Sequence, residues 1–249
     1  MRKVGVYMKD VILEAGVLEV AIPDIQHMSH EKYALARKDY FGASDSSILC
    51  GVNLYKTMEQ LITEKNSKYI TEEEKEVGEK AVVRKGYDLE PVILAKAEDE
   101  LQTKIFKPVD MFKFKDVDGL SVNYDGVTIG PGTKKWVPVE AKLVSKFGEK
   151  YYNKSISHFD ATVVDMKVEG ESLEQHIKRK ALKFGIPAYY YTQVQQEIAG
   201  LNAPFGYLAA LFDESWTFKL FYIKRDDYVI NKIYEICREN ISKIKRDTK

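Results

Sequence analysis

The pattern of the sequence changes after Gln102, and this change limits the fold more than any other feature. Before it, capping signals such as Thr57 with Gln60 introduce segments of helical character. After it, short runs rich in β-formers are separated by turn signals at Asp118-Gly119 and Gly130-Pro131-Gly132. Helices that precede a mixed set of strands and helices predict an α+β, or mixed α/β, fold.

The individual elements follow from apolar periodicity and helix caps. In the first part we expect a hairpin over 4–22 and helices over 29–39, 45–50, 58–65 and 71–101. Strands are then expected over 106–114, 120–124, 127–129 and 136–142. The last part predicts helices over 173–184, 187–201 and 226–244, with strands over 205–212 and 216–223.

The 249 residues contain no internal repeat and no linker rich in Pro, Gly or Ser, so we expect one domain over 1–249. Hydrophobic residues make up 45% of the chain, which excludes intrinsic disorder as its main state. No apolar run approaches the roughly 20 residues that span a bilayer, and Met1-Arg2-Lys3 leads into no signal-peptide core. Cys50 and Cys237 can build no disulfide framework, so a reducing cytoplasm is expected.

The 38 basic residues balance the 38 acidic ones, and this neutrality neither favours nor excludes a nucleic-acid partner. Lys178-Arg179-Lys180 with Lys183 forms a basic helix face that suits either a DNA backbone or plain solvent. Tyr189-Tyr190-Tyr191 could stack on bases, but one or two of these rings are expected in the core. Four histidines lack the spacing of metal ligands and are expected at the surface: His27, His30, His158 and His176.

The strongest chemical signal combines two carboxylates with a lysine. Alternate side chains of a strand share a face, so Glu140 and Lys142 point the same way, and Asp125 at the end of the preceding hairpin can meet them. The Asp125 and Glu140 carboxylates with the Ala141 carbonyl suit magnesium, and Lys142 would orient or deprotonate water in metal-assisted phosphodiester hydrolysis. Glu-x-Lys alone is more often a solvated strand face. The apolar residues that alternate with these charges favour the site.

Five blocks between about Glu31 and Glu239 add to this signal because they occur in a recognisable order. They are Arg37 with Gly42-Ala43-Ser44-Asp45 and Ile48 to Thr57, Gly86 to Pro91, Asp125-Gly126 with Glu140-Ala141-Lys142, Ile186 to Gln195, and Gly206 to Ala209 with Ile223 to Asp226. Together they resemble the YqaJ-like viral recombinase nucleases, relatives of phage lambda exonuclease in the PD-(D/E)XK superfamily. Tyr124 stands where the family usually has proline. The stretch 143–185 is longer than expected and matches poorly.

The resemblance implies a restriction-endonuclease-like core, with a central mixed sheet flanked by helices. It implies a magnesium-dependent 5′→3′ exonuclease that digests one strand of linear double-stranded DNA and leaves a 3′ overhang for a phage annealing protein. Two ions per site are expected, with manganese as an alternative to magnesium. Lambda-type enzymes form rings of three, so a homo-oligomer in the cytoplasm of a bacterial host is expected.

The resemblance also assigns further residues to the catalytic centre. Glu90 is expected as another acidic residue beside the metal ions, although an exposed helix carboxylate that pairs with Lys85 or Arg84 is the alternative. One of Gln193 and Gln195 is expected to reach the centre and bind water or phosphate, with Gln195 favoured.

Arg37 and Ser44 resemble the pair that holds a terminal 5′ phosphate in lambda-type enzymes. A serine at a helix N-terminus is an anion site on physical grounds, because free backbone N–H groups point outward there. A plain N-cap is the more frequent role of serine at such a position.

Other functions remain open from the sequence. The superfamily core also supports single-strand or flap nucleases and endonucleases, because a fold alone does not fix the function. A non-catalytic DNA-binding protein is the alternative from another class. Such a protein would have lost an acidic residue or the lysine, and all of these residues are present here.

Overall fold

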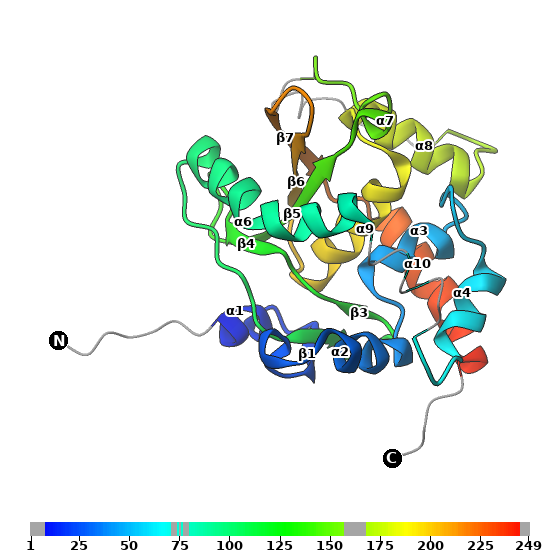
Figure 1. The fold of residues 1–249 in the computed structure, drawn as a ribbon. Helices are drawn as coiled ribbons and strands as arrows, with labels where there is room; N and C mark the ends of the chain where they lie inside the picture. The colour runs from blue at the N-terminus through cyan, green and yellow to red at the C-terminus, as the bar shows by residue number, and fades with distance from the viewer. Residues whose placement is uncertain (1–7, 71–73, 75, 77–79, 157–167, 245–249) are drawn as a thin grey trace.

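The computed structural model describes residues 8–70, 74, 76, 80–156 and 168–244, and two β-sheets with helices around them make up the fold (Figure 1). The smaller sheet is antiparallel and has the order β1 (Leu18–Ile22), β2 (Met111–Phe114), β3 (Ser121–Val122). The larger sheet has the order β4 (Gly126–Ile129), β5 (Trp136–Val144), β6 (Phe205–Phe212), β7 (Thr217–Lys224). Strands β5 and β6 run parallel and the outer pairs antiparallel, so the larger sheet is mixed as predicted.

The helices surround these sheets. They are α1 (Met8–Glu14), α2 (His30–Ala36), α3 (Ser46–Leu49), α4 (Met58–Lys65), α6 (Ala81–Leu101), α7 (Lys146–Glu149), α8 (Leu173–Phe184), α9 (Ala188–Gly200) and α10 (Asp227–Asn240). Short 3-10 turns cover Ile25–His27, Arg37–Asp39, Ala43–Asp45 and Ile241–Lys243. No helix in these described ranges is long and apolar enough to cross a membrane.

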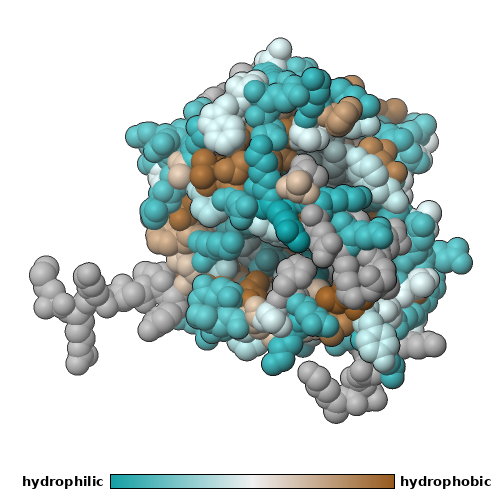
Figure 2. All heavy atoms as spheres, viewed as in Figure 1, coloured by the Kyte–Doolittle hydropathy of each residue, from teal (hydrophilic) through white to brown (hydrophobic). Residues whose placement is uncertain are grey.

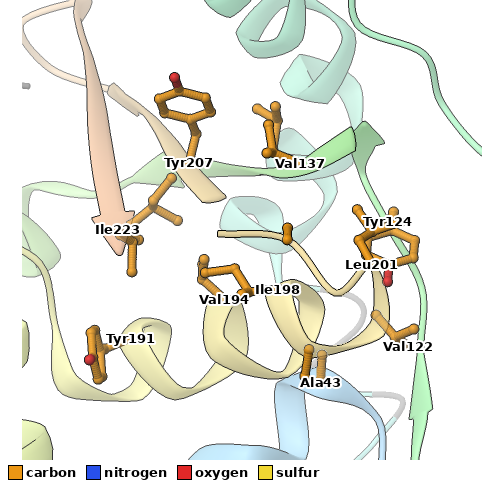
Figure 3. Packing of buried hydrophobic residues seen from close by; sticks show 14 of the residues in the cluster. Ala43, Val122, Tyr124, Val137, Tyr191, Val194, Ile198, Leu201, Tyr207 and Ile223 are labelled. Carbon is orange, nitrogen blue, oxygen red and sulfur yellow. The ribbon is translucent and has the colours of Figure 1, made fainter. Parts of the chain in front are cut away.

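Strand β6 lies at the centre of the core, because all eight of its residues are buried. Helices α6 and α9 both pack on β5 and β6 and cover the two faces of this sheet. Helix α9 points Val194 and Ile198 at the strands (Figure 3). A side chain at Gly206 would lie only 3.1 Å from both residues, so glycine permits this close approach.

Local capping signals predicted several elements well. Helix α4 begins at the predicted capping box, in which Thr57 N donates to Gln60 at 2.8 Å and Gln60 N donates back at 3.3 Å. Helix α8 and strand β6 have the predicted bounds. Helix α6 begins at Ala81 and continues through Gly86 and Pro91. The capping role predicted for Thr71 lies outside the described residues.

Two predicted β-segments were wrong in part. Residues 8–14 form helix α1 instead of a hairpin arm, and β1 pairs with β2. The β-branched residues Val11 and Ile12 are buried on this helix, so packing outweighs their strand propensity. The strand expected over 106–114 begins only at Met111, since Pro108 lacks the N–H that a ladder needs.

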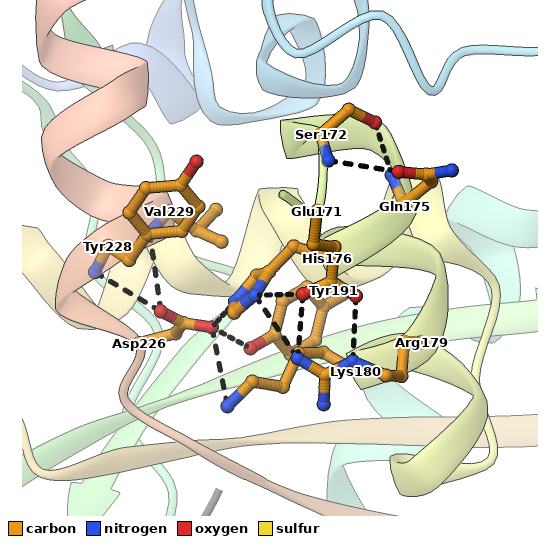
Figure 4. Close-up of polar contacts among 10 residues, drawn as sticks. All are labelled: Glu171, Ser172, Gln175, His176, Arg179, Lys180, Tyr191, Asp226, Tyr228 and Val229. Carbon is orange, nitrogen blue, oxygen red and sulfur yellow. Dashed lines mark hydrogen bonds and ion pairs between the residues drawn. The ribbon is translucent and has the colours of Figure 1, made fainter. Parts of the chain in front are cut away.

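A cluster of polar side chains around buried His176 and Asp226 joins α8, α9 and α10 (Figure 4). His176 Nε2 lies 2.8 Å from Asp226 Oδ2, and the Tyr191 hydroxyl donates to the same oxygen at 2.9 Å. His176 Nδ1 lies 3.2 Å from Glu171, to which Arg179 Nε donates at 2.8 Å. We call this group the His176 cluster.

The cluster corrects two expectations. His176 is only 3% exposed, so the predicted surface position was wrong, whereas His27 is exposed as predicted. His158 lies outside the described residues. The basic face of α8 is also not a row of solvated cations, because Arg179 pairs with Glu171 and Lys180 lies 3.7 Å from Asp226.

Candidate active site

The hairpin of β4 and β5 brings Asp125 to the predicted place. Asp125 directly precedes β4, and Gly126 pairs with Val139 on the antiparallel strand β5. Asp125 Oδ2 accepts a hydrogen bond from the backbone N–H of Ala141 at 3.0 Å. The carboxylate is therefore held beside the segment that carries Glu140 and Lys142.

Glu140 is almost completely buried, with 2% of its surface exposed. Its Oε1 accepts from the Lys142 ammonium and from Gln193 Nε2, the latter at 2.5 Å. Gln193 comes from α9, which packs on the same sheet. Strand and helix thus converge on one carboxylate.

The preference for Gln195 over Gln193 was wrong. Gln195 is buried on another side of α9, where its Nε2 donates to the Lys224 carbonyl and its Oε1 accepts from Asp226 N, both at 2.8 Å. Two residues apart on a helix means a rotation of about 200°, so the two glutamines face opposite ways. Gln193 is the one that reaches Glu140.

Helix α6 contributes Glu90 from the other face of the sheet. Its carboxylate pairs with Lys107, whereas Lys85, one of the two partners considered from the sequence, pairs with Asp213. A side chain at Gly126 would lie 2.5 Å from Ile105 and 3.2 Å from Leu94 of α6. Glycine beside Asp125 therefore lets α6 lie close to β4, and this brings Glu90 toward the other acids.

Arg37 and Ser44 meet as predicted, since Arg37 Nη2 donates to the Ser44 hydroxyl at 3.1 Å. Ser44 is not an N-cap, however. It lies inside the turn Ala43–Asp45, and the Asp45 carboxylate accepts from the N–H of Gly42, the N-cap of this turn, at 2.9 Å. The Asp45 carboxylate also pairs with buried Lys65 at 2.7 Å, which fixes the turn.

One cavity of about 580 Å³ joins these parts. The predicted residues that line it are Arg37, Ser44, Glu90, Asp125, Glu140, Lys142 and Gln193. Tyr33, Tyr87, Lys107 and Asn123 are among the further lining residues. Hydrophilic side chains border a hollow near the centre of the face seen in Figure 2. Gln195 does not line the cavity.

Burial and the nearby negative charge disfavour the ionisation of Glu140 and Glu90. Burial, and then the negative charge of Asp125, raise the pKa of Glu140 to about 7 although Lys142 opposes this. The same two causes raise the pKa of Glu90 against the opposing effect of Lys107. Burial alone would lower the pKa of Lys142, but Glu140 and Asp125 outweigh it and raise that pKa. Lys142 therefore keeps its proton.

Glu197 also belongs to this group, although the sequence analysis did not identify it. It is buried one turn after Gln193, whose Nε2 donates to it at 3.3 Å, and it shares a hydrogen bond with Glu140. Burial and then Glu140 and Asp125 raise its pKa well above the ordinary value. It does not line the cavity and lies behind Glu140. The spacing of four from Gln193 was the one signal available.

The donor chemistry fits a divalent cation. Carboxylate oxygens are the preferred ligands of Mg²⁺ and Mn²⁺, and a cation would relieve the repulsion that raises these pKa values. Among the described residues, no three His, Cys, Asp or Glu side chains converge closely enough to hold an ion as they stand. Lys107 and Lys142 instead neutralise Glu90 and Glu140.

Comparison with known proteins gives matches at two levels. A sequence profile of the YqaJ-like viral recombinase domain matches residues 32–200. The alkaline exonuclease LHK-Exo from Laribacter hongkongensis aligns with a TM-score of 0.57 and 15% identity over 86% of this chain and 91% of that chain. The same enzyme in complex with dAMP gives a TM-score of 0.56, with the same identity and coverage. No protein of curated function matches the sequence. The shared fold confirms the restriction-endonuclease-like core expected above.

Proposed function

Because the chain belongs to the YqaJ-like viral recombinase family, we propose that it is a metal-dependent DNA exonuclease of phage-type recombination. One observation carries this proposal: the acidic group and the Arg37–Ser44 pair line the same cavity. An acidic group that can hold metal and a cationic group that can hold phosphate are the two parts that phosphodiester hydrolysis needs.

Asp125, Glu140 and Glu90, with the Ala141 carbonyl, would hold magnesium or manganese, with two ions per site. When bound, the metal supplies Lewis-acid stabilisation of the negative charge that grows on the phosphate oxygens. The Ala141 N–H holds Asp125 from one side, and Gln193 holds Glu140 from another. Both carboxylates therefore have supporting contacts that restrict their orientation.

Lys142 would act as a cation in this site. Since Glu140 and Asp125 raise its pKa, the ammonium is suited to orient water or phosphate oxygens more than to remove a proton. Gln193 keeps its amide beside Glu140 and lines the cavity, where it can hydrogen-bond water or phosphate. These roles follow from position and charge.

Arg37 with Ser44 would hold the terminal 5′ phosphate. A terminal phosphate carries more negative charge than an internal diester, and a guanidinium with a hydroxyl binds it more strongly. Held there, the end would place the first scissile phosphate over Asp125 and Glu140. This supports 5′→3′ digestion of one strand of linear duplex DNA, with a 3′ overhang left for an annealing protein. It favours end-directed digestion over flap or endonuclease cleavage.

Digestion of end-labelled linear duplex tests the proposal. Wild-type protein should release nucleotides only with magnesium or manganese, and faster from 5′-phosphorylated ends than from 5′-hydroxyl ends. Arg37→Ala should slow attack on phosphorylated ends by roughly 1.5–3 kcal/mol in activation free energy, the value of a hydrogen bond to a charged group. Equal slowing on both ends would make Arg37 a general contact, and indifference of the wild type to the end group would favour the endonuclease.

The family also suggests a ring of three subunits that encloses DNA, which needs a heterologous interface that closes. Light scattering at micromolar protein and moderate salt should then give a trimeric mass. A monomeric mass would contradict the ring while leaving the digestion result intact.

A further inference from the structure

Tyr190 and then Tyr189 lead outward from Lys142, and the exposed Tyr55 and Tyr151 lie near Tyr189. We call these four residues the tyrosine ladder. The Lys142 ammonium lies 5.3 Å from the centroid of the Tyr190 ring, and the Tyr189 ring meets Tyr190 edge-on at 4.5 Å. Burial, and then the neighbouring hydroxyls of Tyr190, Tyr55 and Tyr151, raise the pKa of Tyr189. The Tyr55 and Tyr151 hydroxyls are therefore near enough to Tyr189 to act on it electrostatically.

The outer rings of the ladder are exposed but firmly placed. Tyr55 is 79% exposed, and its loop is fixed by Asn53, whose Oδ1 accepts from the N–H groups of Tyr55 and Lys56 at 2.8 Å each. Tyr151 is exposed beside Tyr152, whose ring is anchored 5.4 Å from Phe212. Exposed rings that gather in one patch, unlike single exposed ones, mark a surface that binds a partner.

The charge around the ladder suits a polyanion. The segment 146–154 carries three lysines and one glutamate. Lys154 pairs with that glutamate, Glu149, whereas the Lys150 ammonium lies 5.0 Å above the Tyr151 ring. Rings with interspersed cations are the usual surface for single-stranded nucleic acid. This segment belongs to the stretch 143–185 that the family pattern left unexplained.

We propose that the tyrosine ladder binds unpaired DNA bases that flank the scissile phosphate. The proposal rests on the proposed function, since it takes the scissile phosphate to lie beside Lys142 and Glu140. Successive nucleotides of one strand are only ~3.4 Å apart along a duplex, so flanking bases come within reach of Tyr190 and Tyr189. Bases inside a duplex are covered by their neighbours, and rings can therefore stack only on unpaired ones.

Binding of a short fluorescein-labelled oligothymidylate, measured by anisotropy in EDTA so that no cleavage occurs, tests the ladder. Tyr55→Ala should weaken binding by about tenfold, the effect of losing one stacked base. Tyr55→Phe should bind like the wild type, because the ring and not the hydroxyl stacks. Tyr69→Ala is the matched control, since Tyr69 is 77% exposed and lies outside the ladder. It should also bind like the wild type.

An abasic oligonucleotide of the same length separates stacking from charge. Wild type and Tyr55→Ala should bind it equally, because no base is present. Unchanged oligothymidylate binding in Tyr55→Ala, or an equal loss on the abasic strand, would overturn the proposal. Digestion of linear duplex by the wild type is measured separately, so failure of the ladder with intact digestion would leave the proposed function standing. Absent digestion would instead overturn the proposed function.

Discussion

The protein holds two groups of carboxylates, one around buried Glu140 and one around buried Asp226, that differ in how their charge is balanced. In the His176 cluster, Arg179 lowers the pKa of Glu171 to about 2. Burial would raise the pKa of Asp226, but His176 and Lys180 outweigh it and lower that pKa. In the cavity, burial and Asp125 raise the pKa of Glu140 to about 7, although Lys142 is in contact with it.

The difference indicates which group stabilises the fold and which group is suited to bind a ligand. Each carboxylate of the His176 cluster has enough cationic and hydrogen-bonding partners to remain charged, so the cluster stabilises the meeting of α8, α9 and α10. The acids of the cavity stand too close to one another for the cations present. Groups that repel in this way are typical of functional sites, where a ligand completes the balance.

The largest expected effect is on the cleavage rate, and it comes from neutralising a carboxylate of the cavity but not one of the His176 cluster. Glu140→Gln and Asp125→Asn should each abolish cleavage of linear duplex in magnesium, because an amide is a poor ligand for a hard cation. Glu171→Gln in the His176 cluster is the matched control and should cleave at the wild-type rate per folded molecule. Near wild-type cleavage by either cavity variant would contradict the assignment of catalysis to the cavity.

The second largest expected effect is on how the free energy of unfolding depends on pH, which should differ between the two groups. The pKa of Glu140 in the folded chain, about 7, lies above its ordinary value of 4.5. Its contribution is therefore fully present below pH 4.5 and is lost as pH rises through about 7, by roughly 3 kcal/mol at most. Glu171, whose folded pKa is about 2, contributes stability above pH 4.5 that is lost as pH falls.

Thermal unfolding in EDTA should accordingly show a fall in Tm between pH 5 and 8 that Glu140→Gln removes and magnesium reverses. Glu171→Gln should keep this fall and lose part of the stability near neutral pH. A wild-type Tm that is flat between pH 5 and 8 in EDTA would contradict the repulsion assigned to the cavity.

The smallest expected effect distinguishes two residues of one helix. Gln193→Ala should lower kcat and leave the free energy of unfolding nearly unchanged, because Gln193 donates a hydrogen bond to the Glu140 carboxylate in the cavity. Gln195→Ala should cost about 1–2 kcal/mol of unfolding free energy, since it leaves the buried Asp226 N–H unpaired, and should keep kcat. Urea unfolding and single-turnover cleavage measure the two quantities. An exchange of these effects would place Gln195 at the chemistry after all.

The sequence predicted what depends on local signals. The capping box of Thr57 placed α4, and alternation along β5 put Glu140 and Lys142 on one face. The pairing of Arg37 with Ser44, seven residues apart, came instead from the family resemblance. At Val11 and Ile12 the local signals predicted a hairpin, but the chain forms a helix there because tertiary packing outweighs strand propensity.

The sequence could not predict contacts between distant segments. His176 is buried beside Asp226, which is fifty residues away in the sequence, and no residue near His176 indicates this contact. Helix geometry says that Gln193 and Gln195 face opposite ways, but only packing decides which of them meets Glu140. Glu197 was missed for the same reason.

Helix α9 serves both groups with opposite sides, since Gln193 and Glu197 meet Glu140 whereas Tyr191 and Gln195 meet Asp226. Insertion or deletion of one residue within α9 would turn everything beyond it by about 100°. Such a change would break the contacts of α9 with Glu140 and those with Asp226 at the same time. Descendants of this chain can therefore vary α9 by replacing residues but not by altering its length, so alignment gaps among relatives should avoid this helix.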